Sequence, residues 1–351
     1  MIHAPGRSAA SAMVFLGAGM RIFLGLAVEY SAAYNAGWLC PFLALLLCLP
    51  LGIALYAAGE IGNDAPWNTL CSRCPMAVRQ VCAVLFALLL IYDCAIVVRH
   101  TAATANFVSL NATSTAWLTL PLALVIFIVV VLGPDAEGNS VRIWLKLLPL
   151  IFGVVIAVQF ERYNINWLTP VLGSGTAPLL QGGLLGGGWL ALMYLPWMLA
   201  VPDRKRNSIV RPGILSVLAA AALLASLQLL SPTLVETNLS QIARAELILS
   251  NNRVSHTLQM FLTILWFGSL LHLIAIEAAS AACFIQNSFI HLPKWSIAMI
   301  CSLLCALLSF SRFTGTTHAA RMYRLNFILI GSIFACVMAF ALRRSGGDLH
   351  V

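Results

Sequence analysis

Ten long apolar stretches alternate with short charged or polar segments along the chain. A helix needs about 20 apolar residues to cross the roughly 30 Å hydrocarbon core of a bilayer, and each stretch is close to that length. The sequence therefore predicts an all-α polytopic membrane protein that forms a single integral membrane domain over 1–351. The ten expected spans are 11–33, 37–58, 77–100, 115–133, 141–160, 180–201, 212–231, 257–283, 294–311 and 323–343.

Composition supports a membrane location. Of the 351 residues, 61% are hydrophobic and 9% are charged, whereas a soluble domain carries about 25% charged residues. Basic residues indicate the orientation, because they are enriched in cytosolic loops. A cytosolic N-terminus places twelve lysines and arginines inside and seven outside, with the cluster 203–206 as the strongest anchor. We therefore expect both termini in the cytosol.

The spans divide into two groups of five around the loop at 161–179. This predicts a 5+5 inverted repeat, with a first half at 11–160 and a second half at 180–343, because an odd number of spans per half reverses the polarity of the second half. The charged, amphipathic segment 233–256 is expected to be an outer loop that covers the entrance.

Glycine clusters occur in spans one and six, the first span of each half. They are Gly17-Ala18-Gly19 and Gly186-Gly187-Gly188. Paired helix interruptions in two halves are typical of the binding site of a transporter, where unwound backbone faces a ligand. We predict that both helices break at these glycines and bind a small solute, with Trp189 and Tyr194 enclosing its apolar part. The alternative is that the glycines only allow close helix packing.

Several segments resemble the endospore germination permeases, which are the B-subunits of nutrient germinant receptors in the amino acid–polyamine–organocation superfamily. They are 35–39, which opens the second span, 138–143 followed by Pro149, 166–173, and Trp266. The resemblance implies a leucine-transporter-like fold, recognition of a small nutrient that is often an amino acid, and signalling of germination with partner subunits. It also implies the spore inner membrane as the location.

Four charged residues stand out within the predicted spans: Arg21, Glu29, Asp93 and Glu277. Charges in hydrocarbon are costly and are candidates for function. In transporters of the implied fold, spans one and eight are neighbours and often hold a sodium ion. We hypothesise that Arg21 and Glu277 form an ion pair in that place. Alternatively, each pairs with a different group or faces a water-lined wall.

Three further residues allow two interpretations each. Asp93 could bind the amine of a ligand or relay a proton, or it could be a hydrogen-bonded structural carboxylate. Lys146 in span five could stand in for a coupling cation, or it could extend to the inner surface. His272 could be an interhelical hydrogen-bond donor or a proton shuttle.

The ten cysteines lie mostly in apolar stretches, where they behave as small apolar residues. Cys71 and Cys74 have a metal-like spacing, but two thiols cannot complete a tetrahedral zinc site. They are either incidental thiols or a redox or metal pair. We expect no metal and no cofactor.

These features favour a permease-like subunit of a spore germinant receptor that binds an amino acid or similar metabolite at mid-membrane. The alternative is an active amino acid transporter, either proton-coupled or uncoupled. An enzyme is not expected, because Asp93 is the one aspartate in the predicted spans and no histidine–glutamate metal motif is present. Expected partners are a small ligand, the bilayer and other receptor subunits, but no nucleic acid.

Overall fold

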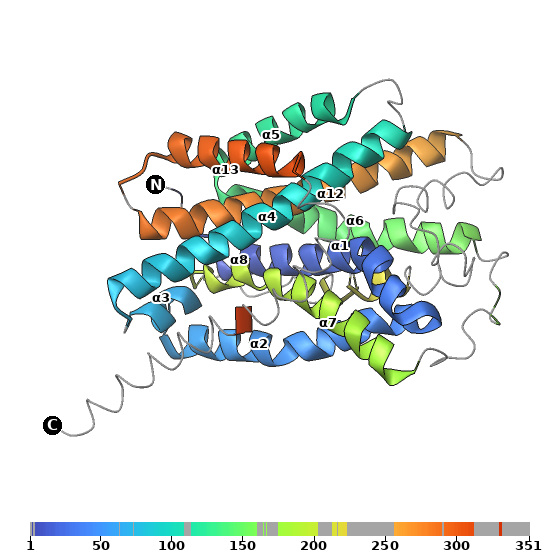
Figure 1. Ribbon diagram of the computed structural model, residues 1–351, viewed down its shortest axis with the longest axis horizontal. Coiled ribbons are helices and arrows are strands. Elements are labelled where there is room, and N and C mark those ends of the chain that lie inside the picture. Colours follow the sequence, from blue (N-terminus) through green and yellow to red (C-terminus); the bar gives the residue numbers. More distant parts are fainter. Residues whose placement is uncertain are drawn as a thin grey trace.

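The computed structural model is built from helices (Figure 1). It describes residues 2, 4–62, 64–72, 74–108, 114–159, 164, 166, 175–202, 213–215, 217–222, 256–289, 291–311 and 330–331. Within these ranges there is no strand, and one isolated bridge joins Gly6 to Val201.

Most of the described residues lie in eleven helical elements. Their bounds are α1 Arg7–Ala33, η1 Tyr34–Leu39, α2 Cys40–Gly62, α3 Pro66–Cys71, α4 Met76–Val108, α5 Thr115–Leu132, α6 Pro134–Gln159, α7 Thr176–Leu192, α8 Leu195–Met198, α12 His256–Ser288 and α13 Lys294–Ser309.

Three segments in the described chain are long and apolar enough to cross a bilayer individually: Ala36–Tyr56, Met76–Ala103 and Phe267–Ser288. A fourth span is added if Ala116–Leu132 and Pro134–Val154, which meet at a 113° bend, count as one. The chain is thus a helical protein with several clear membrane spans. The total of ten, the 5+5 repeat and the cytosolic termini remain predictions.

Some expected features fall on parts of the chain that are not described. Of predicted span seven, 213–215 and 217–222 are described, and of span ten only 330–331. The basic cluster 203–206 and residues 233–255 of the outer amphipathic segment lie outside the described residues.

The bend between α5 and α6 is made by Gly133. Its φ of +90° belongs to the region that glycine adopts at little cost, and its N–H caps α5 by donating to the carbonyl of Val129 at 2.8 Å. Pro134 then starts α6, where the missing proline N–H is not needed. Asp135 and Glu137 lie in the first turn of α6, which is the favourable end for negative charge.

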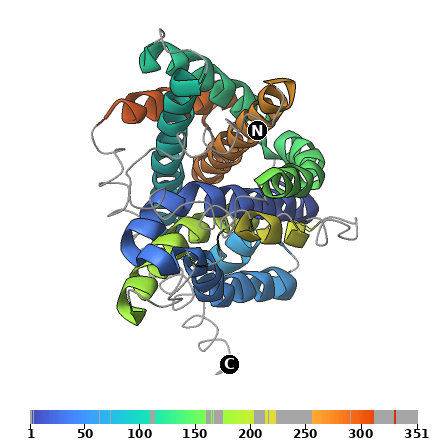
Figure 2. The same cartoon turned by 90° about the vertical axis from the view of Figure 1, so that its right-hand side faces the viewer.

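The first helix lies at the centre of the molecule. Figures 1 and 2 show α1 between α2 and α7 on one side and α4 and α12 on the other. It packs directly against α6, α7 and α12. This position brings the middle of α1 close to side chains from helices far apart in the sequence.

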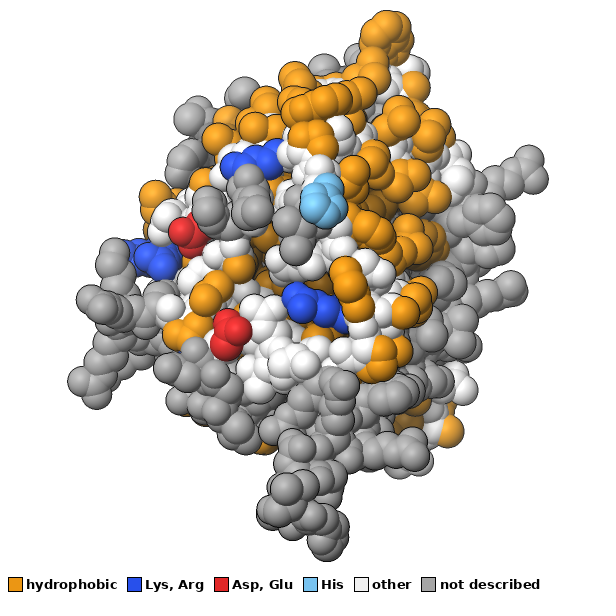
Figure 3. Space-filling view, turned by 90° about the vertical axis from the view of Figure 1, so that its left-hand side faces the viewer, with side chains coloured by type: hydrophobic (Ala, Val, Ile, Leu, Met, Phe, Trp, Pro, Cys, Tyr) orange, Lys and Arg blue, Asp and Glu red, His pale blue; other side chains and the backbone are white. Residues whose placement is uncertain are grey.

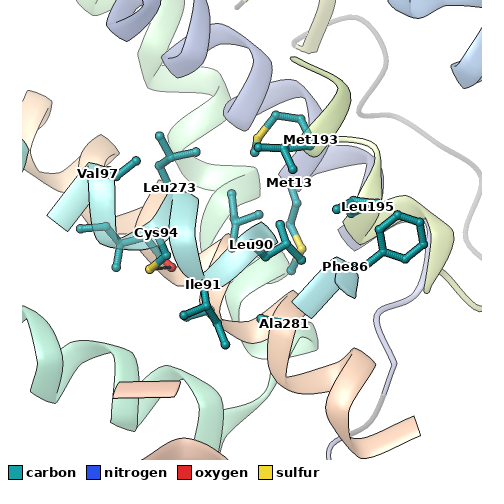
Figure 4. Close-up of a cluster of buried hydrophobic side chains, with 14 of the residues drawn as sticks. Met13, Phe86, Leu90, Ile91, Cys94, Val97, Met193, Leu195, Leu273 and Ala281 are labelled. Atoms are coloured by element: carbon teal, nitrogen blue, oxygen red, sulfur yellow. Dashed lines mark hydrogen bonds between the residues drawn. The ribbon is translucent and has the colours of Figure 1, made fainter. Parts of the chain in front are cut away.

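Tight apolar packing surrounds the first half of α1. Figure 4 shows Met13 of α1 near side chains from α4, α12 and the end of α7. Toward one end of α4, the rings of Trp67, Phe86 and Phe284 contact one another with centroids 5.4 to 5.9 Å apart. These contacts fix α3, α4 and α12 relative to one another.

The outer surface suits a lipid environment. Leu46 and Ile53 of α2 are 62% and 63% exposed, and Leu303 of α13 is 62% exposed. Figure 3 views one end of the bundle and shows hydrophobic side chains covering its flank, with a few charged side chains and a histidine among them. A flank of this kind is stable against acyl chains and would be costly in water.

Candidate functional site

The candidate site is a buried cluster of charges where α1, α4 and α12 meet. Arg21 of α1 is 1% exposed, and Asp93 of α4 and Glu277 of α12 are fully buried. Nη1 of Arg21 donates to Oδ1 of Asp93 at 2.9 Å, and Nη2 donates to Oδ2 of the same carboxylate. Nη2 also donates to Oε1 of Glu277. One guanidinium therefore binds two carboxyl groups.

Trp189 of α7 completes the cluster. Its indole N–H donates to Oδ1 of Asp93 at 3.3 Å, and the Arg21 guanidinium carbon lies 5.2 Å from its ring centroid. A cation above an aromatic face is attracted by the ring quadrupole. Four helices thus contribute one polar side chain each to a single buried network.

This arrangement partly matches the sequence hypotheses. Arg21 and Glu277 lie together, as the ion-pair hypothesis requires. Asp93 is the second partner of Arg21, and its two interpretations, a ligand or proton contact and a hydrogen-bonded structural carboxylate, had not paired it with Arg21. Trp189 was also assigned to a ligand, whereas its described polar contacts are with Asp93 and Arg21. The functional role of all four residues remains a prediction.

The predicted helix breaks at the glycine clusters are wrong. Helix α1 is continuous through Gly17-Ala18-Gly19, and α7 is continuous through Gly186-Gly187-Gly188 to Leu192. The glycines allow close packing, which was the alternative interpretation. A Cβ at Gly17 would overlap the side chain of Met193, and the thiol of Cys48 reaches the carbonyl of Gly187 at 3.2 Å.

The second predicted broken helix is interrupted six residues later, between α7 and α8. Pro196 has no N–H to donate to the carbonyl of Leu192, and its ring clashes with a helical carbonyl at that position. The N–H groups of Trp197 and Met198 instead both reach the carbonyl of Tyr194, at 3.0 and 3.1 Å. Sequence reasoning missed this break, although Pro196 inside an apolar stretch was the stronger signal for it.

A cavity of about 390 Å³ lies beside this interruption. Near it, Trp197 donates its indole N–H to the Ser11 hydroxyl at 3.3 Å and packs on Tyr56 with centroids 6.0 Å apart. Tyr194, expected to enclose a ligand, also lines it. The lining is mostly apolar and aromatic, from α1, α2 and the α7–α8 junction: Ser11, Val14, Phe15, Leu49, Gly52, Ile53, Tyr56, Tyr194 and Trp197.

A second polar pair joins α12 to α6. Nδ1 of His272 lies 2.6 Å from Oε1 of Glu137, and the His272 ring packs on Trp144 with centroids 5.2 Å apart. His272 therefore has the interhelical partner that one of its two interpretations requires. Lys146 has an exposed side chain on α6 and is not a member of the Arg21 cluster.

The two loop thiols are buried. Cys71 is 2% exposed and Cys74 is 9% exposed, and neither is part of a disulfide. Burial, with a smaller contribution from the neighbouring Cys74, raises the pKa of Cys71 to about 12. Among the described residues, no group of three or more potential ligands is placed to hold a metal ion. Glu29 lies in α1, but its side chain is outside the described part.

Solved structures show which fold the helices form. The chain resembles a substrate-bound outward-open state of a Na⁺-coupled sialic acid symporter, with TM-score 0.56 and 13% identity over 96% of this chain and 78% of the symporter. It also resembles the manganese transporter of Eremococcus coleocola in complex with an aromatic bis-isothiourea substituted compound, with TM-score 0.50 and 13% identity over 97% and 80% of the two chains. Such low identity establishes a transporter fold and nothing about substrate.

Sequence comparison adds a family. Residues 9–243, more than half of the chain, match the spore permease family model, which is described as spore germination protein. Among curated proteins, no relative matches significantly.

Proposed function

The chain belongs to the spore germination protein family, and on that basis we propose that it is a permease-like subunit of a nutrient-germinant receptor. In this proposal it binds an amino acid or similar small metabolite within the membrane. Family membership and the transporter fold support a multi-pass permease-like protein. The ligand, the spore inner membrane and the partner subunits are parts of the proposal.

The observation that carries the proposal is the buried cluster of Arg21, Asp93 and Glu277 at the meeting point of the helices. Buried charges are expensive and are retained in membrane helices mainly where they serve a function. An amino acid zwitterion carries a carboxylate that suits a guanidinium and an ammonium group that suits a carboxylate. The cluster therefore offers both groups that a zwitterion needs.

We propose that the ligand binds by exchange with an internal contact. The carboxylate of the ligand takes the place of Glu277 on Arg21. The ammonium group of the ligand pairs with the Glu277 carboxylate that is released in this exchange. Trp189, already packed on the guanidinium, provides an apolar face for the ligand side chain. The glycines of α1 and α7 contribute by keeping these helices close, and no unwound peptide groups are invoked.

A ligand-dependent stability screen tests this proposal. We expect one or a few amino acids to raise the melting temperature of the purified protein, because binding to the native state alone stabilises it by about 2.7 kcal/mol at 100 times Kd. The shift should disappear in Glu277→Gln, which removes the carboxylate released to the ammonium group, and persist in Lys146→Gln, which alters an exposed charge outside the cluster. Equal shifts in both variants, or no shift with any amino acid, would refute the proposed site.

An active transporter is the second candidate, since the similar solved structures are transporters. Uptake of the stabilising amino acid into proteoliposomes separates the two functions. Binding without accumulation supports a receptor subunit, whereas robust accumulation would show that the protein still transports.

A further inference from the structure

The hydrogen bonds of the two carboxyl groups in the cluster are unequal. Both oxygens of Asp93 accept hydrogen bonds from Arg21, and Oδ1 accepts another from Trp189. Oε1 of Glu277 accepts from Arg21, but its Oε2 is buried and has no hydrogen-bond partner among the described residues. Asp93 is therefore surrounded by donors, as an ionised carboxylate requires, and Glu277 is not.

The charges of the cluster do not balance if both carboxyl groups are ionised. One guanidinium faces two carboxylates, which leaves a net negative charge in a site without solvent access. A buried charge without a partner costs several kcal/mol and is usually neutralised by a proton. The oxygen that has no donor is the position where such a proton fits.

Among the described residues, the groups packed around Glu277 include no positive charge besides Arg21. Arg21 faces it from α1, Asp93 and Cys94 from α4, and Cys305 from α13, and the described residues of α5 are not titratable. On α12 itself, the His272 ring is already paired with Glu137 of α6. Tyr194, which directly precedes α8, cannot carry a positive charge. A metal cation is disfavoured here, because the neighbouring guanidinium repels it and the described surroundings supply few oxygen ligands.

We propose that Glu277 is a proton-binding site: its carboxyl group carries a proton on Oε2, while Arg21 and Asp93 form the permanent ion pair. The proton neutralises the cluster in the ligand-free protein. The assignment depends on the cluster geometry alone, so it can hold whether or not the proposed germinant binds.

Infrared difference spectroscopy of the full-length protein, purified without ligand, tests the assignment. At neutral pH the wild type should show the carbonyl stretch of a protonated carboxyl group, and Glu277→Gln should lose that band completely. Glu137→Gln, which changes the second buried glutamate of the described residues, should keep it. If Glu277→Gln fails to fold, Glu277→Asp should shift the band to a different frequency without abolishing it.

Four results would overturn the assignment. Three are the absence of the band in wild type, its retention in Glu277→Gln, and its loss in Glu137→Gln. Disappearance of the band on adding sodium chloride would also overturn it, because the site would then exchange its proton for a cation. A failed amino acid screen with the band intact would refute the proposed ligand site and leave the proton site standing.

Discussion

The cluster predicts that substitutions of its two carboxyl groups are strongly non-additive. In Asp93→Asn, Arg21 loses a charged partner that binds it through two hydrogen bonds. Glu277 can then release its proton and become the counterion, so we expect a loss of about 2 kcal/mol, the value of a hydrogen bond to a charged group. In Glu277→Gln, the amide oxygen still accepts from Arg21, and the loss should be about 0.5 kcal/mol.

The double variant removes both possible counterions. It leaves a buried guanidinium without a carboxylate, for which the expected loss is about 5 kcal/mol. This exceeds the combined single losses by about 2.5 kcal/mol, well above the roughly 0.5 kcal/mol scatter of independent sites. The free energy of unfolding of each variant in mixed micelles, titrated with denaturing detergent, measures the difference.

The matched control pairs Asp93→Asn with Lys146→Gln, whose side chain is exposed on α6. These two changes should add within about 0.5 kcal/mol. If Asp93→Asn and Glu277→Gln also prove additive, Glu277 does not replace Asp93 as the counterion, and the reasoning about the proton fails.

Three further predictions concern packing, the loop thiols and the helix interruption. Gly138→Ala should destabilise the protein by about 2 kcal/mol, because the added Cβ would overlap Ala9 of α1 and lie 3.0 Å from its Cα. On the same helix, a Cβ at Gly153 would meet nothing within 4 Å, so Gly153→Ala should stabilise the protein by about 0.5 to 1 kcal/mol in the same unfolding titration. If Gly153→Ala proved more destabilising than Gly138→Ala, the packing of α1 on α6 would be contradicted. The pKa of Cys71 is raised to about 12, so its thiol should stay protonated and react slowly with maleimide between pH 7 and 9. Labelling of the folded protein is read by mass spectrometry, and rapid labelling would contradict the burial of Cys71. Pro196→Ala restores an N–H donor to the interruption and should increase protection from hydrogen exchange at 192–197, whereas unchanged protection would mean that another residue causes the break.

The sequence was sufficient to identify the charged members of the cluster, and insufficient to pair them. Arg21, Asp93 and Glu277 are conspicuous because charges are rare in apolar spans. Their partners depend on how α1, α4 and α12 are rotated about their axes, which apolar periodicity does not determine when a helix is hydrophobic on all sides. Pairing Arg21 with Glu277 was therefore possible from the implied fold, but the closer involvement of Asp93 and Trp189 was not.

The glycine clusters illustrate a second limit. A run of glycines lowers helix propensity and also permits close packing, and the sequence does not say which effect dominates. In a bilayer, an α-helix satisfies every backbone hydrogen bond, so propensity costs of about 1 kcal/mol per glycine are readily offset. Proline removes a donor outright, and the interruption lies next to Pro196 and not at Gly186-Gly187-Gly188, although Pro50, Pro121 and Pro149 lie inside continuous helices.

The most direct test of the account is a ligand-bound structure of the protein with the amino acid that most raises its melting temperature. The account predicts solute density between α1, α4, α7 and α12, with the carboxylate on Arg21 and the Glu277 contact released. Density in the cavity beside Tyr194 and Trp197, with the Arg21 cluster intact, would contradict it.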